Sequence, residues 1–138
     1  MKKIIYMLLI ITMVICGQIE IKAATLEDSQ LEILAKCVEA EAGNQGLMGK
    51  RFVVDVILNR VDSERFPNDI KAVISQNGQF SVYSNGRMSK AIPTEETLDA
   101  VRMELEHRTD SEILFFASGN YNKCCTPAYK HEDHYFGY

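Results

Sequence analysis

The spacing of apolar residues predicts a helix near the start of the folded part of the chain. Aliphatic and small side chains recur every three or four positions from Leu31 to Ala42, which is the spacing of one helix face. Ser29 followed by Glu32 has the form of a capping box, and Gly43-Asn44 is a pair that ends helices. We therefore expect a helix that begins near Ser29 and ends before Gly43.

Residues 47–61 form the second predicted helix. Their aliphatic content alone would also suit a buried strand. However, Arg51, Asp55 and Asn59 are spaced four residues apart, so in a helix they form one polar stripe on an otherwise apolar surface. The stripe and the length of the segment favour a largely buried helix.

Shorter elements are predicted in the middle of the chain. Asn68 or Asp69 can cap a short helix, which ends by Gly78. Aromatic residues precede Asn85-Gly86, a dipeptide suited to the left-handed conformations of a tight turn. We therefore expect residues 79–91 to form a small hairpin.

The last third of the chain adds one helix and the strands. Pro93-Thr94 opens a helix whose inner face should carry Leu98, Val101 and Leu105. Residues 113–117 read as a short buried strand, and residues 129–136 as a last strand that follows a polar loop. The chain is thus predicted to form one α+β domain, rich in helix, with a small antiparallel sheet.

The first 23 residues have the pattern of an export signal. Lys2 and Lys3 precede an apolar run at 4–15, and Ala23 offers a small residue for cleavage. The run is short for a membrane span, so we expect no stable span after processing, although an uncleaved anchor is the alternative. A lipoprotein at Cys16 is disfavoured because no small residue precedes it. Residues 24–138 would then be the mature catalytic domain.

Charge and cysteine content narrow the function classes. The formal net charge is −4, and loss of the leader makes the chain more acidic, which argues against nucleic acid as a partner. Binding to an anionic wall must therefore rely on a shaped groove. Of Cys37, Cys124 and Cys125, at least one stays unpaired. Three free thiols are the favoured interpretation, and one bridge from Cys37 is the alternative.

Glu41 is the carboxylate with the most unusual predicted position. It lies on the flank of the apolar face, one turn after Cys37 and Val38, whereas Glu39 is expected to be a solvated surface charge. Apolar surroundings raise the pKa of a carboxyl, so that it can hold a proton near neutral pH. A general acid for glycosidic cleavage needs this property. The alternative is that Glu41 is an ordinary glutamate at a helix end whose carboxylate reaches water, because such a residue has the same sequence pattern.

Four ordered motifs resemble a known family. They are ILAKCVEAEAGNQG, GKRFVVDVILNRV, RFPNDIKAVISQNGQFS and the terminal DHYF. They are similar to the spore cortex-lytic type of cell-wall hydrolase of spore-forming bacteria and some of their phages. The likeness runs from about Leu31 to Phe136, which is nearly the whole mature chain.

The resemblance implies a lysozyme-like or lytic-transglycosylase-like fold that cleaves peptidoglycan strands between N-acetylmuramic acid and N-acetylglucosamine. The catalytic glutamate of the family falls in an Ala-Glu-Ala motif, which here is Ala40-Glu41-Ala42. The protein would act outside the cell, in the wall or spore cortex, and the need for an accessory protein is open. Aromatic, amide and hydroxyl groups suited to a sugar groove, together with the matching motifs, give the candidate substrate-binding residues Gln79, Phe80, Ser81, Tyr83 and His134.

The chemistry follows from the number of acids available. Many relatives carry Arg-Gly-Glu where this chain has Gly43-Asn44-Gln45, so no second acid stands beside Glu41. Asp62 and Glu64, in a predicted loop, are the first places to look for another base. A hydrolase uses two carboxylates, whereas a lytic transglycosylase can use one. The sequence therefore favours the transglycosylase route.

Two other classes are the alternatives. A metal-dependent amidase or peptidase would use His131, His134 and a cysteine, but the spacing of zinc motifs is missing and we expect no metal or other cofactor. An exported wall-binding module without catalysis is the second alternative.

The export signal gives the first testable prediction. Secreted protein should begin near Ala24 or Thr25, because cleavage near Ala23 removes the basic and apolar segments. N-terminal sequencing of the secreted material checks this. Recovery of only full-length, membrane-bound protein would contradict it.

Overall fold

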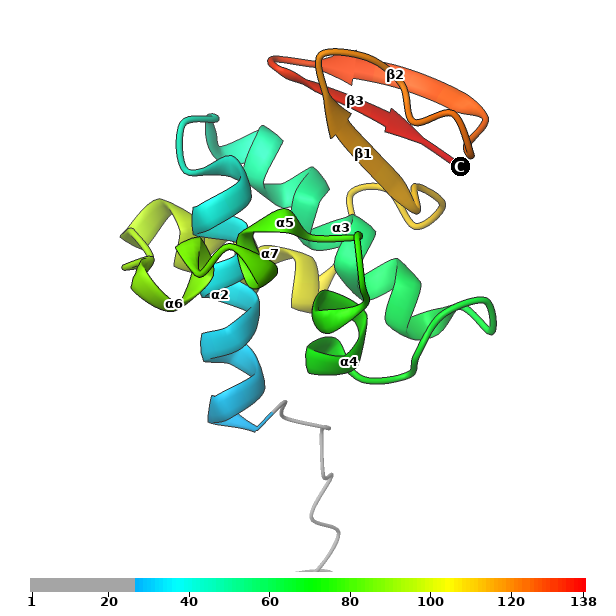
Figure 1. Ribbon diagram of the computed structural model, residues 1–138. Coiled ribbons are helices and arrows are strands. Elements are labelled where there is room, and N and C mark those ends of the chain that lie inside the picture. The colour runs from blue at the N-terminus through cyan, green and yellow to red at the C-terminus, as the bar shows by residue number, and fades with distance from the viewer. Residues whose placement is uncertain (1–26) are drawn as a thin grey trace, which may run out of the picture.

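The computed structural model describes residues 27–138, so the predicted leader lies outside the described residues. A group of helices carries a three-stranded sheet at one end (Figure 1). None of the helices in this part of the chain is long and apolar enough to span a membrane. The single helix-rich α+β domain with a small antiparallel sheet is confirmed.

Two long helices form the centre of the domain. They are α2 (Asp28–Ala42) and α3 (Leu47–Asp62), joined by a short turn. The predicted helix over 47–61 is confirmed, and its aliphatic residues fill the core. The capping box is wrong, because α2 begins one residue earlier, with Glu27 as its N-cap and no side-chain hydrogen bond there. Ser29 therefore lies inside the first turn.

Two of the other helices have side-chain caps, of which the one at Asp69 was predicted. Asp69 caps α4 (Ile70–Ser75) by accepting the Ala72 amide at 2.9 Å. Thr94 caps α7 (Glu95–Glu106) by accepting the Thr97 amide at 3.3 Å. The inner face of α7 differs from the prediction, because Leu105 is exposed and the buried positions are Thr97, Ala100, Val101 and Glu104.

The predicted hairpin at 79–91 is wrong. The segment forms two short helices, α5 (Ser81–Ser84) and α6 (Arg87–Lys90). Gly86 between them has φ 77°, so the dipeptide does make a left-handed turn, but the turn joins helices. The physical reason is tertiary: Val82 is buried in the core, and Arg87 donates to the Ala40 carbonyl of α2.

The sheet has the order β1-β3-β2 and is antiparallel throughout. Its strands are β1 (Phe115–Ser118), β2 (Pro127–His131) and β3 (His134–Gly137). The predicted last strand at 129–136 is therefore two strands joined by a tight turn at Glu132-Asp133. Glu132 has φ 47°, a conformation that costs energy in any residue with a side chain. Contacts of this turn with the helices, described below, offset that cost.

The polar stripe of α3 holds the connection between α7 and β1. Asp55 Oδ2 accepts the Asp110 amide at 2.9 Å, and Asn59 Nδ2 donates to the Asp110 and Ile113 carbonyls at 2.8 and 2.9 Å. Arg60 Nε donates to the Leu114 carbonyl at 2.7 Å. These bonds satisfy buried backbone groups that no strand partner reaches. Asp55 and Asn59 of the stripe, together with the adjacent Arg60, thereby fix where the sheet begins.

A buried acid pair lies at the start of this connection. Asp55 and Glu104 are both fully buried. Glu104 accepts from the Arg51 side chain and from Thr109, whereas Asp55 Oδ1 has no donor among the described residues. Burial first, and then the hydrogen bond with Glu104, raises the pKa of Asp55. We therefore expect the two carboxyls to hold one proton between them.

We therefore predict that the protein loses stability as the pH rises from about 4, the ordinary carboxyl pKa, through the raised pKa of Asp55. Asp55→Asn should flatten this dependence, because its amide donates to Glu104 without ionising. At alkaline pH we expect the free energy of unfolding of Asp55→Asn to be roughly 1–3 kcal/mol higher than that of the wild type. Urea unfolding over a pH series measures this, with Asp62→Asn as the exposed control. Parallel curves for Asp55→Asn and wild type would contradict the shared proton.

Candidate functional site

Glu41 lies in the last turn of α2 and is half-buried. Cys37, one turn earlier, is fully buried beneath it, and the pKa of the Cys37 thiol is raised by burial and by the Glu41 charge. Burial also raises the pKa of Glu41, and this effect outweighs the opposing effects of the Val82 amide and the Arg87 guanidinium. Glu41 is thus a carboxyl that takes up a proton more readily than an exposed glutamate does.

Glu39, two residues earlier, shows the opposite behaviour. Burial would raise its pKa, but hydrogen bonds from Thr97 and Thr94 outweigh burial and lower the pKa. Its Oε2 accepts the Thr94 amide at 3.1 Å and also the Thr97 hydroxyl. The prediction of a solvated surface charge is therefore wrong, because partners on α7 hold Glu39. Of two neighbouring carboxylates, one is held ionised and the other is poised to carry a proton.

Arg87 is the charged group that faces Glu41 from another helix. Its Nη2 donates to the Ala40 carbonyl at 2.7 Å, at the carboxyl end of α2. Arg87 also lines an open hollow of about 350 Å³ between the end of α2 and α6, with Glu39, Ala40, Lys90, Ala91 and Ile92. A guanidinium at this place binds a carbonyl in the last turn of α2 and lies beside the candidate acid.

The turn that follows Glu41 is held by the tip of the β2–β3 hairpin. The Gln45 side chain donates to Asp133 Oδ2 at 3.1 Å and accepts the Asp133 amide at 3.2 Å. Glu132 Oε2 accepts the Gly46 amide at 3.0 Å. A Cβ at Gly49 would lie 2.8 Å from Gln45 Cβ and 2.9 Å from the Glu132 carboxylate, so a side chain here would displace both. The sheet is therefore attached to the helices next to the candidate acid.

The predicted substrate-binding residues fall into two groups. Gln79, Ser81 and Tyr83 are exposed on the segment around α5, whose Val82 amide reaches Glu41. Phe80 and His134 are each only 3% exposed, so almost no ring surface is left to touch a sugar. Their burial has a clear cause, because both rings pack on Phe116, with centroids 6.0 and 5.1 Å away.

Arg60 was not predicted as part of the site. It is 3% exposed, and its guanidinium lies over the rings of Phe66, Phe80 and Phe115 at 4.8, 5.3 and 5.3 Å. Its Nη1 donates to Gln79 Oε1 at 3.0 Å. Burial and repulsion from Arg65 lower the pKa of Arg60 to about 10, so it stays charged at neutral pH. Its place inside the motif GKRFVVDVILNRV is the one sequence signal that points to it.

The candidate metal ligands do not gather. Within residues 27–138, no group of three or more histidine, cysteine or acidic side chains lies close enough to hold an ion. Cys37, Cys124 and Cys125 are all free thiols, in agreement with the favoured interpretation.

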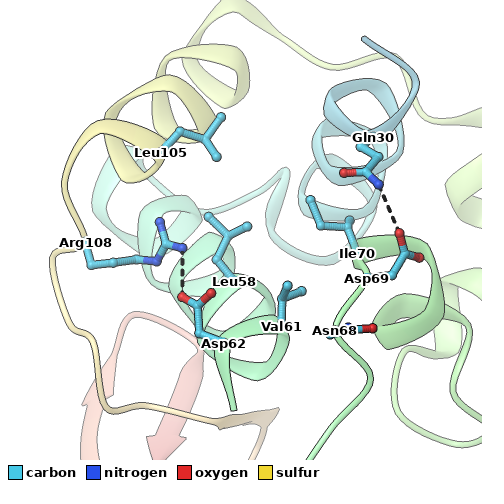
Figure 2. A pocket seen from close by; sticks show the side chains of 9 residues that line it. All are labelled: Gln30, Leu58, Val61, Asp62, Asn68, Asp69, Ile70, Leu105 and Arg108. Atoms are coloured by element: carbon cyan, nitrogen blue, oxygen red, sulfur yellow. Dashed lines mark hydrogen bonds and ion pairs between the residues drawn. The ribbon is translucent and has the colours of Figure 1, made fainter. Parts of the chain in front are cut away.

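A separate hollow of about 200 Å³ lies at the end of the α2–α3 pair that is far from Glu41 (Figure 2). Gln30 and Asp69 close one side of it, and Arg108 with Asp62 the other. Gln30 and Glu41 are eleven residues apart on α2, which is about 16 Å. Asp62 is thus at the far end of the helix pair from Glu41.

Comparison with solved structures defines the class of the fold. The catalytic domain of the SleB protein of Bacillus cereus matches with a TM-score of 0.73 and 23% identity, over 83% of this chain and 93% of that one. The catalytic domain of a protein described as the germination-specific lytic transglycosylase SleB, from Bacillus anthracis, matches with a TM-score of 0.73 and 22% identity, over 83% and 98%. The lytic-transglycosylase-like fold is confirmed.

Sequence comparison gives the family. The model of the family described as Cell Wall Hydrolase matches residues 44–136, and this chain belongs to that family. The match begins just after Glu41. A spore cortex-lytic enzyme of Halalkalibacterium halodurans is 31% identical over 65 residues, which are 47% of this chain. The matched region is 20% of that relative, so the chain spans about a fifth of its length.

The position of Arg87 gives a prediction that needs no activity assay. Arg87→Ala should raise the pKa of Glu41 further, because the guanidinium favours the ionised carboxylate. Carbon-detected NMR titration of the Glu41 carboxyl measures this. Lys90→Ala, which removes a cation from the same hollow, is the control and should have the smaller effect. An unchanged Glu41 titration in Arg87→Ala would show that the two groups do not interact.

Proposed function

We propose that this protein cleaves peptidoglycan glycan strands between N-acetylmuramic acid and N-acetylglucosamine, as a lytic transglycosylase with Glu41 as general acid and base. The observation that carries the proposal is the environment of Glu41. Burial against Cys37 favours its protonated form, while the neighbouring Glu39 is held ionised. Family membership and the fold agree with peptidoglycan as substrate.

In the proposed reaction Glu41 first donates its proton to the glycosidic oxygen, and the bond from that oxygen to the anomeric carbon of the muramic sugar breaks. The 6-hydroxyl of the same sugar then bonds to the anomeric carbon. The ionised Glu41 accepts the proton that this hydroxyl loses. The product is a 1,6-anhydro-muramic end, and no water is consumed. An intramolecular nucleophile needs no second base to activate it.

The distribution of the other carboxylates supports a single acid. Asp62 ends α3 and Glu64 follows it, at the far end of the helix from Glu41, and the 16 residues of this helix span about 24 Å. Glu39 is bound to α7, and Glu132 and Asp133 bind the turn after α2. The other carboxylates near the end of α2 in the described residues thus hold structural bonds, which supports Glu41 as the proposed acid.

The exposed residues around α5 are the proposed sugar contacts. Gln79, Ser81 and Tyr83 lie on the segment that approaches Glu41, and they offer an amide, a hydroxyl and an aromatic ring. Phe80 and His134 support this segment from inside the core. We further propose that the protein acts after export, in the spore cortex or the cell wall.

Glu41→Gln tests the proposed acid. It should lower the rate of fragment release from purified peptidoglycan by about 10²- to 10⁴-fold, because the amide cannot transfer a proton. Mass spectrometry of released muropeptides measures the rate, and Glu32→Gln, an exposed change on the same helix, should leave it unchanged.

Activity retained in Glu41→Gln would contradict the assignment. Loss of wild-type activity on treatment with a chelator would instead support the metal-dependent amidase or peptidase. An unaltered wall with the wild-type protein would support the binding module.

A further inference from the structure

The side-chain amide of Gln79 faces a buried cation. Arg60 Nη1 donates to Gln79 Oε1 at 3.0 Å, and Arg60 Nε donates to the Leu114 carbonyl at 2.7 Å. No carboxylate of residues 27–138 forms an ion pair with Arg60, and three aromatic rings surround its guanidinium. Gln79 is therefore the polar side chain that this buried cation binds in the described part of the protein.

The cation determines which way the amide points. A guanidinium has only donors, so the Gln79 oxygen must face Arg60 and its NH₂ group must point away from it. Rotation of the amide by half a turn would bring two donors together and leave Arg60 Nη1 without an acceptor. Because Arg60 is fixed by the rings and by Leu114, this orientation is set before any ligand arrives.

A purely structural role would not require an amide here. A carboxylate at position 79 would pair with the buried Arg60 more strongly than a neutral oxygen does. The amide adds one property that a carboxylate lacks, which is an outward-facing donor on an exposed residue. Gln79 lies three residues before Val82, so at most about 11 Å of chain separates it from the backbone amide that favours the ionised form of Glu41.

We propose that Gln79 is a specificity-determining residue that donates to an acetamido carbonyl oxygen of the glycan, and that Arg60 is the positioning residue that fixes the direction of this donor. The inference rests on the proposed function, because both sugars of the strand carry acetamido groups. Such a carbonyl is a stronger acceptor than a sugar hydroxyl, and it marks amino sugars among glycans. The contact is present before and during bond cleavage, so it acts mainly on KM.

Two variants of Gln79 separate this role from a structural one. Gln79→Glu keeps an oxygen towards Arg60 and removes the outward donor. It should unfold at the same temperature as wild type or higher, with KM for soluble glycan chains raised roughly three- to tenfold and kcat little changed. Gln79→Met removes both interactions, so it should lose stability as well as affinity. Asn77→Asp places the same added charge on an exposed residue of the same loop and should leave KM unchanged.

The substrate supplies the second half of the test. The KM of the wild type should rise by a similar factor on chains whose amino sugars have been de-N-acetylated. The KM of Gln79→Glu should rise little further on these chains. A Gln79→Glu enzyme as active as wild type, or variants whose activity follows only their stability, would overturn the inference while the proposed function stands. Wild type that releases no fragments from either substrate would overturn both.

Discussion

The polar stripe of α3 is the constraint on which the arrangement of the site depends. Asp55 and Asn59 bind the connection between α7 and β1, and Arg60 binds Leu114 just before β1 begins. These bonds set the position of the sheet relative to the helices. The sheet in turn carries the hairpin tip, which binds the turn after Glu41. The polar stripe inside the core therefore helps to position the candidate acid, because it places the sheet that holds the turn after Glu41.

The helix α2 places two glutamates in different surroundings within one turn. Glu39 meets the amide and hydroxyl donors of α7, which favour its ionised form. Glu41 lies against the buried Cys37, and burial raises its pKa above that of an exposed glutamate. The chemistry proposed for the site depends on this difference, since an acid that is always ionised cannot donate a proton to a leaving oxygen.

Periodicity predicted the elements whose burial is regular along the chain. It predicted α2 and α3, because each buries a regular stripe of side chains. The cap of α4 was also predicted, because Asp69 bonds to an amide only three residues away. It failed at 79–91, where Asn85-Gly86 indicates a turn but does not determine what the turn connects. Local sequence also shows nothing of the Glu39 bond to Thr94, because the two are 55 positions apart.

The site was predicted in the same uneven way. Glu41 stood out because its helical neighbours are apolar, and the structure places it in that half-buried position. Phe80 and His134 were predicted to bind substrate, yet aromatic packing on Phe116 leaves both rings buried. Arg60 was missed, because a charged residue in an apolar helix gives no sign of the ring cluster that will surround it.

Cleavage of peptidoglycan in water enriched with oxygen-18 is the most direct test of the central claim, that Glu41 acts alone. In the proposed reaction the sugar's own hydroxyl closes on the anomeric carbon, so the released muramic ends should be anhydro sugars without the label. Reducing muramic ends that carry one labelled oxygen would show that water attacks, and that a second base assists Glu41.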